Sequence, residues 1–281
     1  MNFRPRILTS AIVAIALSSV ATNAQTTSVK ITDYLKSRST RLEKICSIND
    51  DALSARIFKE YGAIFVGIDA VTAPPRCIFE SESELSAFQG RLISKTESIA
   101  GTAVTLQSDA MKALKLAIAE AEKRGKKITP RGGTTASTRS FADTQRLWDS
   151  RFLPGLSFWI GKGKITSADA EAAKKLSIPD QVRRVLEWES KGYFFSTGKD
   201  RTILSSVAAP GTSQHLSMLA LDVTQFADPV VRQILNANGW YQTVADDTPH
   251  FTYIGVAERE LPSRGLQVVA RGGYTFWVPN L

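Results

Sequence analysis

The sequence predicts an α+β fold in which helices pack on a largely antiparallel sheet, preceded by a small N-terminal α/β appendage. Helical hydrophobic spacing dominates the first two thirds of the 281 residues, and strand-like apolar runs dominate the rest. Helices followed by strands, rather than alternating with them, are typical of this class. With 43% hydrophobic residues and no internal repeat, the chain can form one large domain or a domain with an appendage.

Residues 1–24 have the pattern of a secretory signal peptide. Arg4 and Arg6 precede an apolar run from Ile7 to Val20, and small residues then lead to a cleavage point after Ala24. A retained anchor is the alternative, but the run is shorter than the roughly 20 residues that a membrane-spanning helix needs. We therefore expect an exported protein, periplasmic or secreted, without a stable membrane anchor.

The net charge indicates the kind of partner. The formal charge is +8, and removal of residues 1–24, which hold two arginines and no acidic residue, lowers it to +6. A basic surface favours anionic polymers such as cell-wall material or nucleic acid. Because export removes the chain from nucleic acid, we expect no nucleic-acid partner. The sequence does not indicate an oligomeric state.

Cys46 and Cys77 are the only cysteines. An even pair in an exported chain predicts one disulfide, with two buried free thiols as the alternative. No CxxC pair is present, which argues against a zinc-finger type of cluster.

The predicted N-terminal subdomain spans residues 25–95. It combines helical stretches with short apolar runs, at Ile31–Ile45, Asp51–Tyr61, Ala63–Ile68 and Cys77–Phe79.

The predicted main domain spans residues 96–281. Its first helix runs from Gln107 to Arg124, with apolar residues three and four apart and Gly125 as its end. Ser140 and Asp143 have the spacing of a capping box, which begins a second helix and places Arg139 in the loop before it.

We expect residues 150–205 to form an insertion that shapes the substrate site. This segment has helix signals at 167–176 and 177–192. Strand-like runs follow at 219–223 and 251–256, separated by a helix from Asp228 to Asn238. A further β-rich run, 267–278, ends the domain.

The chain contains two histidines, and both stand near carboxylates in the sequence. Catalytic zinc commonly takes three histidine and carboxylate ligands and leaves a fourth position open. Residues seven apart in a strand point to opposite faces, so His215 must lie in the turn before the strand that contains Asp222. Pairing of that strand with the one that begins near His250 would bring these three side chains to one ion.

Hydrolysis at such an ion also needs a proton acceptor and a group that stabilises an oxyanion. Asp247, three residues before His250, is the candidate acceptor, and Arg139 is the candidate for holding a substrate carbonyl or carboxylate. The spacing alone leaves simpler interpretations open. His215 could make a loop hydrogen bond, His250 and Arg139 could lie on the surface, and Asp246-Asp247 could form a solvated turn.

Three ordered blocks of the sequence resemble the VanY-type D-alanyl-D-alanine carboxypeptidase family. The family's S-G-Y-R-S, S-x-H-x2-G-x-A-x-D and E-P-W-H-F elements are matched by Ser137-Thr-Arg139-Ser140, Ser213-Gln-His215-x4-Ala220-x-Asp222 and Asp247-x-x-His250-Phe251. The resemblance spans roughly residues 100–257 and leaves the N-terminal part unexplained.

This resemblance implies the Hedgehog/D-Ala-D-Ala peptidase fold and one Zn²⁺ ion as cofactor. The implied ligands are His215, Asp222 and His250. The implied substrate is the peptide stem of peptidoglycan, from which metal-activated water would release a terminal D-alanine. Two alternatives stay open: an endopeptidase of the same fold, and a zinc-stabilised binding module with little or no turnover, as in the Hedgehog domain.

The resemblance also assigns roles around the ion. Asp247 falls on the family's catalytic glutamate and would act as general base, Arg139 falls on its substrate-orienting arginine, and Ser213 and Gln145 would contact substrate. Asp247 is one methylene shorter than glutamate, and a displacement of about 1 Å can lower a rate about a hundredfold. Met218 replaces a small glycine of the family, and Gln145 stands one position later than the family's glutamine.

Overall fold

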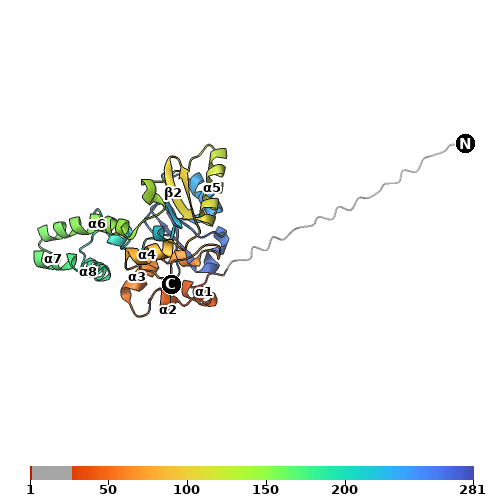
Figure 1. Ribbon diagram of the computed structural model, residues 1–281. Helices are drawn as coiled ribbons and strands as arrows, with labels where there is room; N and C mark the ends of the chain where they lie inside the picture. The colour runs from red at the N-terminus through yellow and green to blue at the C-terminus, as the bar shows by residue number, and fades with distance from the viewer. Residues whose placement is uncertain (2–26) are drawn as a thin grey trace.

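The computed structural model describes Met1 and residues 27–281, so the expected signal peptide lies outside the described residues. Figure 1 shows a main body from which a helical arm projects to one side. The helices are α1 (Ile31–Ser37), α2 (Leu42–Ile45), α3 (Ala52–Tyr61), α4 (Glu82–Gln89), α5 (Ser108–Lys123), α6 (Phe141–Gly161), α7 (Ser167–Lys174), α8 (Ile178–Ser190) and α9 (Pro229–Ala237). The strands are β1 (Ser94–Ile99), β2 (Thr102–Gln107), β3 (Ala220–Asp222), β4 (Trp240–Tyr241), β5 (His250–Tyr253), β6 (Leu266–Arg271) and β7 (Tyr274–Pro279). Within the described residues, no helix has the length and apolar character needed to cross a membrane.

The strands form three small antiparallel sheets, ordered β1-β2, β3-β5-β4 and β6-β7. Antiparallel pairing was predicted, but the prediction of one main sheet was wrong. The β1-β2 hairpin was not predicted, because β1 is polar and mostly exposed and gives little strand signal. Ala100 and Gly101, both with positive φ, form its turn.

The central core lies between the β3-β5-β4 sheet and the helices α5 and α9. Leu114 and Ala117 of α5 pack with Val231 and Leu235 of α9 and with Phe251 of β5, and all are fully buried. The α5 residues have the three- and four-residue spacing from which this helix was predicted.

The N-terminal helices share a hydrophobic core with the end of the chain. Ile31 and Phe58 pack in one cluster with Ile254 and Trp277. Between residues 27 and 93 the structure contains helices and turns but no strand, so the expected α/β character of this segment was wrong. The apolar run at 63–66 forms a 3₁₀ helix, η1 (Gly62–Val66), that is buried on most sides. The expected helix at 31–45 is divided into α1 and α2.

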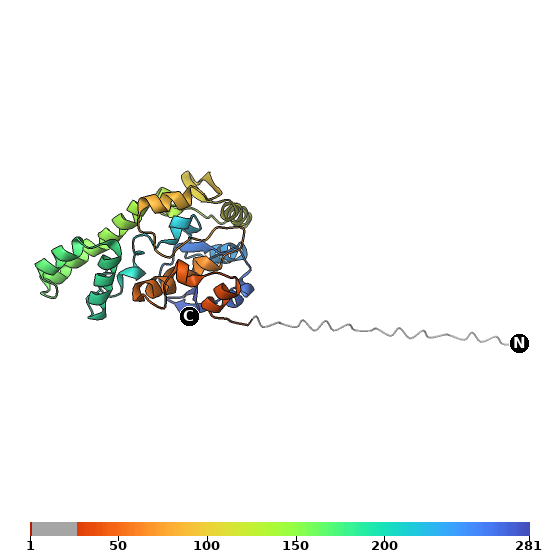
Figure 2. The ribbon, with the colours of Figure 1, turned by 60° about the horizontal axis from the view of Figure 1, so that its bottom comes forward.

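The helices α6, α7 and α8 form the arm, which Figures 1 and 2 show projecting from the body. The predicted capping box of Ser140 and Asp143 begins α6. A hydrophobic cluster around Trp148, Val185 and Phe195 fills the arm and continues into the body, where it includes Leu53 and Ile57 of α3. The arm overlaps residues 150–205, where an insertion was predicted, and α6 enters it directly from the body.

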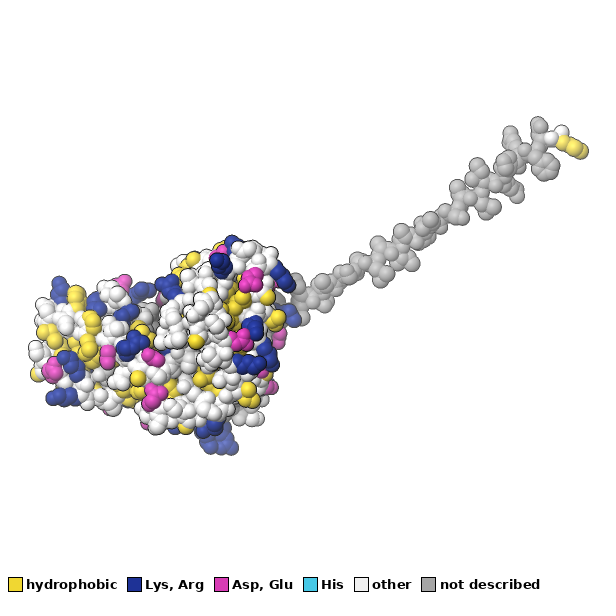
Figure 3. Space-filling model, turned by 45° about the horizontal axis from the view of Figure 1, so that its top comes forward, with side chains coloured by type: hydrophobic (Ala, Val, Ile, Leu, Met, Phe, Trp, Pro, Cys, Tyr) yellow, Lys and Arg dark blue, Asp and Glu magenta, His cyan; other side chains and the backbone are white. Residues whose placement is uncertain are grey.

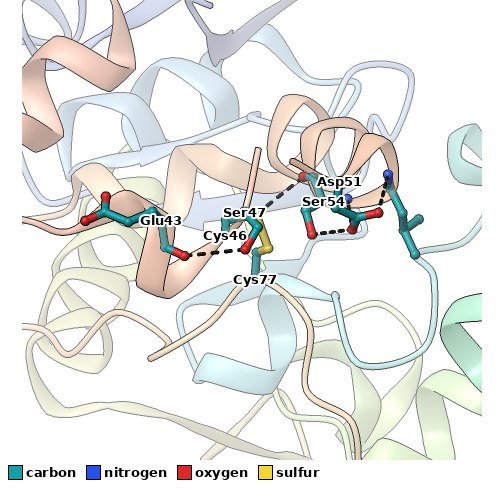
Figure 4. The surroundings of a disulfide bond; sticks show 7 residues. Glu43, Cys46, Ser47, Asp51, Ser54 and Cys77 are labelled. Atoms are coloured by element: carbon teal, nitrogen blue, oxygen red, sulfur yellow. Dashed lines mark hydrogen bonds between the residues drawn. A yellow bond between two sulfur atoms is a disulfide. The ribbon is translucent and has the colours of Figure 1, made fainter. Parts of the chain in front are cut away.

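Cys46 and Cys77 form the expected disulfide, which joins the end of α2 to the segment before α4 (Figure 4). Beside it, the Asp51 carboxylate accepts hydrogen bonds from the backbone N–H groups of Leu53 and Ser54 and caps α3. The disulfide therefore links the first helices of the chain to the segment that leads into the main body.

We predict that Cys46→Ser/Cys77→Ser lowers the melting temperature. The bond joins residues 31 apart, and closing a loop of about that length stabilises by about 3–4 kcal/mol. For a chain of this size the loss corresponds to roughly 6–16 °C in a calorimetric scan. Dithiothreitol should lower the wild-type value and leave the double variant unchanged. Equal melting temperatures for the two proteins would contradict a stabilising role.

Candidate metal centre

A tight turn leads the chain into the site. Gly211 has a φ of 78°, and a Cβ there would lie 2.0 Å from the carbonyl oxygen of Phe79, so the turn requires glycine. The short 3₁₀ helix η4 (Gln214–Ser217) follows and carries His215, as expected for a residue placed before the strand. Met218 then adopts the left-handed conformation, with a φ of 54°, before β3 begins. A left-handed residue thus stands where the resembling family has glycine.

Strand pairing places the other two side chains. Asp222, at the end of β3, is the direct partner of His250 at the start of β5. Side chains of directly opposed residues project from the same face of a sheet. The expected pairing of these strands is therefore present, and it brings Asp222 and His250 beside His215.

The three side chains present their lone-pair atoms to one another at nearly equal distances. Nε2 of His215 lies 3.1 Å from Nδ1 of His250 and 3.3 Å from Oδ1 of Asp222. Nδ1 of His250 lies 3.3 Å from the same carboxylate oxygen. These residues form a group that could hold a metal ion.

The triangle of ligand atoms fits a tetrahedral ion. Zinc bonds to nitrogen and oxygen of about 2.0–2.2 Å give ligand atoms roughly 3.3–3.5 Å apart at the corners of a tetrahedron. The observed separations of 3.1 to 3.3 Å are close to that spacing. Two imidazoles and one carboxylate are a donor set that suits zinc, and three of them leave a fourth position open.

Arg139 contacts the same carboxylate from its other side. Its Nη2 donates to Oδ2 of Asp222 at 2.8 Å, and its Nε donates to the backbone oxygen of Thr135 at 3.1 Å. Nη1 lies 3.5 Å from Oγ of Ser213, which is a weak contact. Arg139 therefore orients Asp222 and keeps one nitrogen available beside Ser213.

Burial and charge shift the pKa values of His215 and Asp222 toward the forms that bind a cation. Burial and the charge of Arg139 lower the pKa of His215 to about 4, so its imidazole is neutral at pH 7. Burial opposes ionisation of Asp222, but its interactions with His215 and His250 outweigh burial and hold its pKa well below the usual range. A neutral imidazole and an ionised carboxylate are the metal-binding forms.

Asp247 faces the same cavity, which has a volume of about 470 Å³. This is within the range of about 300–1,000 Å³ typical of ligand pockets. Burial raises the pKa of the Asp247 carboxyl, and the neighbouring charge of Asp222 raises it further, while His250 and Arg139 lower it. No described residue donates a hydrogen bond to this carboxylate, so it is free to interact with a molecule in the cavity.

Helix α6 and the loop that returns from the arm supply most of the other cavity-lining residues, and sequence analysis did not identify them. They include Thr144, Leu147 and Arg151 of α6. Gln145, expected to contact substrate, is exposed and does not line the cavity. Residues 144, 147 and 151 are three and four apart and share one face of α6, whereas position 145 is turned about 100° from position 144.

Gln214 is a further residue that sequence analysis did not single out. Its side-chain oxygen lies 2.8 Å from Nε2 of His250, on the side of the ring opposite Nδ1. This contact joins positions 36 apart in the chain, so the sequence carries no signal for it beyond the position of Gln214 next to His215. Both histidines are buried, and neither is visible on the face shown in Figure 3.

Comparisons with known proteins give similar solved structures, among them two of VanY enzymes. No protein-family model matches the chain, and no curated protein sequence matches it. A variant of the vancomycin-resistance D,D-pentapeptidase VanY from a VanB-type cassette, in complex with Zn(II), is 18% identical with a TM-score of 0.34, and the match covers 62% of this chain and 85% of that one. VanYB in complex with D-alanine-D-alanine is 18% identical with a TM-score of 0.36, covering 62% and 86%. TM-scores this low do not establish a shared fold, and the function is inferred below from the chain's own site.

We predict that the purified protein binds about one zinc ion per chain and that His215→Ala abolishes this binding. Nδ1 of His215 has no hydrogen-bond partner among the described residues, so the substitution removes the ligand atom without breaking a second bond. Zinc content after dialysis, measured by mass spectrometry, provides the test.

Asp246→Asn is the matched control for this measurement. Asp246 lies next to the site in sequence but forms an ion pair with Arg271 at 2.8 Å and does not line the cavity. It should retain the wild-type zinc content. Full zinc content in His215→Ala would show that the assignment of His215 as a ligand is wrong.

Proposed function

We propose that this protein is a zinc-dependent D-alanyl-D-alanine carboxypeptidase that acts on peptidoglycan stem peptides. The observation that carries the proposal is the triangle formed by His215, Asp222 and His250, with the carboxylate of Asp247 in the same cavity. The three sequence blocks that resemble VanY-type carboxypeptidases contain these four residues and Arg139. The spatial arrangement brings together the residues that the sequence motifs single out, and both support the same function.

The chemistry divides between the ion and the side chains. When bound, Zn²⁺ polarises a carbonyl oxygen and lowers the pKa of water. Asp247 accepts the proton of the water whose oxygen attacks the scissile carbonyl carbon, and it delivers that proton to the amine as the C–N bond breaks. A base in this role works best with a pKa near the working pH, and burial moves the pKa of Asp247 upward in that direction.

Arg139 is suited to orient the substrate. Its Nη2 and Nε are engaged by Asp222 and Thr135, whereas Nη1 has only the long contact with Ser213. A carbonyl or carboxylate oxygen of the peptide can accept a charge-assisted hydrogen bond from this nitrogen. The same guanidinium would therefore bind both Asp222 and the peptide, and so position the peptide relative to the metal site.

Two further arginines favour a substrate with several carboxylates. Arg131 and Arg151 line the cavity, and neither forms an ion pair with a described carboxylate. The Nε of Arg151 donates to Oγ of Ser206 at 2.8 Å, which fixes the side chain at the junction of body and arm. Unpaired guanidinium groups beside a reaction centre bind anionic groups of a ligand, and peptidoglycan stems with a free terminus carry such groups.

The function is tested by incubating the purified zinc-loaded protein with a pentapeptide stem that ends in D-Ala-D-Ala. Release of free D-alanine supports the carboxypeptidase. Cleavage at an internal bond would instead favour an endopeptidase. Bound zinc without cleavage of any stem peptide would contradict both enzyme functions and favour a zinc-stabilised binding module.

We predict that Asp247→Asn lowers kcat by about 10²- to 10⁴-fold, because general-base catalysis commonly contributes that much. Zinc content should stay at the wild-type level, since the ligand atoms come from other residues. Steady-state kinetics on the pentapeptide measure the loss, and Asp246→Asn, which does not line the cavity, should behave as wild type. Wild-type kcat in Asp247→Asn would remove Asp247 from the mechanism.

Arg151→Gln is predicted to raise KM for the pentapeptide roughly 10- to 100-fold, the value of one charged hydrogen bond of about 1.5–3 kcal/mol. The same substitution should have little effect on a peptide whose side carboxylates are amidated. Arg146→Gln is the control, because Arg146 lies on the same helix, is exposed, forms an ion pair with Asp143 and does not line the cavity. An equal rise in KM for both peptides would contradict carboxylate binding by Arg151.

A further inference from the structure

We infer that Gln214 is a positioning residue that fixes the tautomer of His250, so that the Nδ1 lone pair of this imidazole is directed toward the metal. A neutral imidazole carries its proton on one of two nitrogens, and only the unprotonated nitrogen can bind a metal. The inference rests on the proposed metal site but does not depend on which peptide bond, if any, is cleaved.

The amide of Gln214 can take only one orientation. Its Nε2 donates to the backbone oxygen of Tyr61 at 2.9 Å, so its Oε1 is the atom that lies 2.8 Å from Nε2 of His250. A carbonyl oxygen only accepts hydrogen bonds. Nε2 of His250 must therefore carry the proton, which leaves the lone pair on Nδ1.

Two threonines hold this orientation. Oγ1 of Thr252 lies 2.5 Å from Oε1 of Gln214, and Oγ1 of Thr243 lies 2.7 Å from that of Thr252. Thr252 can donate to Gln214, and Thr243 can donate to Thr252 or, at 3.2 Å, to the same Oε1. Each neighbour of Oε1 can thus act as a donor, which fits a carbonyl oxygen at this position. Gln214, His250 and both threonines are at most 4% exposed, so loss of one of these bonds leaves a buried polar group without its partner.

The opposite tautomer would obstruct the site. A proton on Nδ1 of His250 would point into the triangle, toward Nε2 of His215 at 3.1 Å and Oδ1 of Asp222 at 3.3 Å. It would occupy the position of the ion. Loss of the hydrogen-bond partner of a metal-binding histidine typically lowers metal affinity about 10–100-fold.

The chain is well suited to a direct test, because it has only two histidines. In protein made without a histidine tag and labelled with ¹⁵N-histidine, long-range ¹H–¹⁵N spectra should show two imidazoles, assigned with His215→Ala. We expect metal-free His250 to carry its proton on Nε2. A wild-type His250 protonated on Nδ1 would overturn the inference before any variant of Gln214 is made.

Substitutions at Gln214 test its effect on metal affinity. Gln214→Met keeps the length of the side chain but removes the acceptor, and it should mix the tautomers of His250 and weaken zinc binding about 10–100-fold in competition with a chelator. Gln214→Glu keeps an acceptor for Nε2–H, so it should retain the wild-type tautomer and recover most of the affinity.

Gln181→Met is the matched control. Gln181 is also buried, accepts from Nε1 of Trp148 at 2.7 Å and donates to the backbone oxygen of Ala173 at 3.3 Å, but it lies within the arm. It should lower stability without changing zinc affinity or the spectrum of His250. Zinc affinity in Gln214→Met equal to that of this control would overturn the inference. Failure of the zinc-loaded wild type to cleave stem peptides would overturn only the proposed function.

Discussion

The pairing of β3 with β5 is the interaction on which the site and much of the core depend. Its register sets Asp222 opposite His250, and the same strands carry Leu221 and Phe251 into the central core. Because side chains alternate across a strand, a slip of one residue would move one partner to the other face and expose the apolar residues. Burial of the core thus selects the register that assembles the candidate metal centre.

The site is a buried polar cluster in which most groups have a defined partner. Asp222 interacts with Arg139 through one oxygen and with the two histidines through the other. Gln214 contacts Nε2 of His250, on the side of the ring that faces away from the triangle. Buried lone pairs that face one another repel unless a proton or a cation lies between them, so the triangle gains stability when an ion is bound. Met218, which leads from η4 into β3, has a left-handed backbone conformation that costs roughly 1–2 kcal/mol. Burial of its side chain among Phe79, Phe88 and Leu216 offsets this cost.

The fold was predicted best where a single element carries its own signal. The spacing in α5, the capping box of α6 and the Asp228-Pro229 start of α9 each depend on residues within one or two turns, and each helix is present. Predictions failed where packing between distant segments decides the structure. The run at 62–66 forms a 3₁₀ helix because the N-terminal helices and the last strands cover it, and the short strands pair in three sheets rather than one.

The sequence by itself determined which residues can bind a metal and in what order they occur, because only two histidines are present and each stands near a carboxylate within a recognisable block. Only the tertiary structure decided which groups surround them. Arg139 contacts Asp222 across 83 positions, and Gln214 contacts His250 across 36. Arg151 lies on the face of α6 that lines the cavity, whereas Gln145 of the same helix is exposed and lies on another face. Ligand identity depends on side-chain chemistry, which the sequence states directly, but orientation and charge depend on contacts between distant segments that exist only after folding.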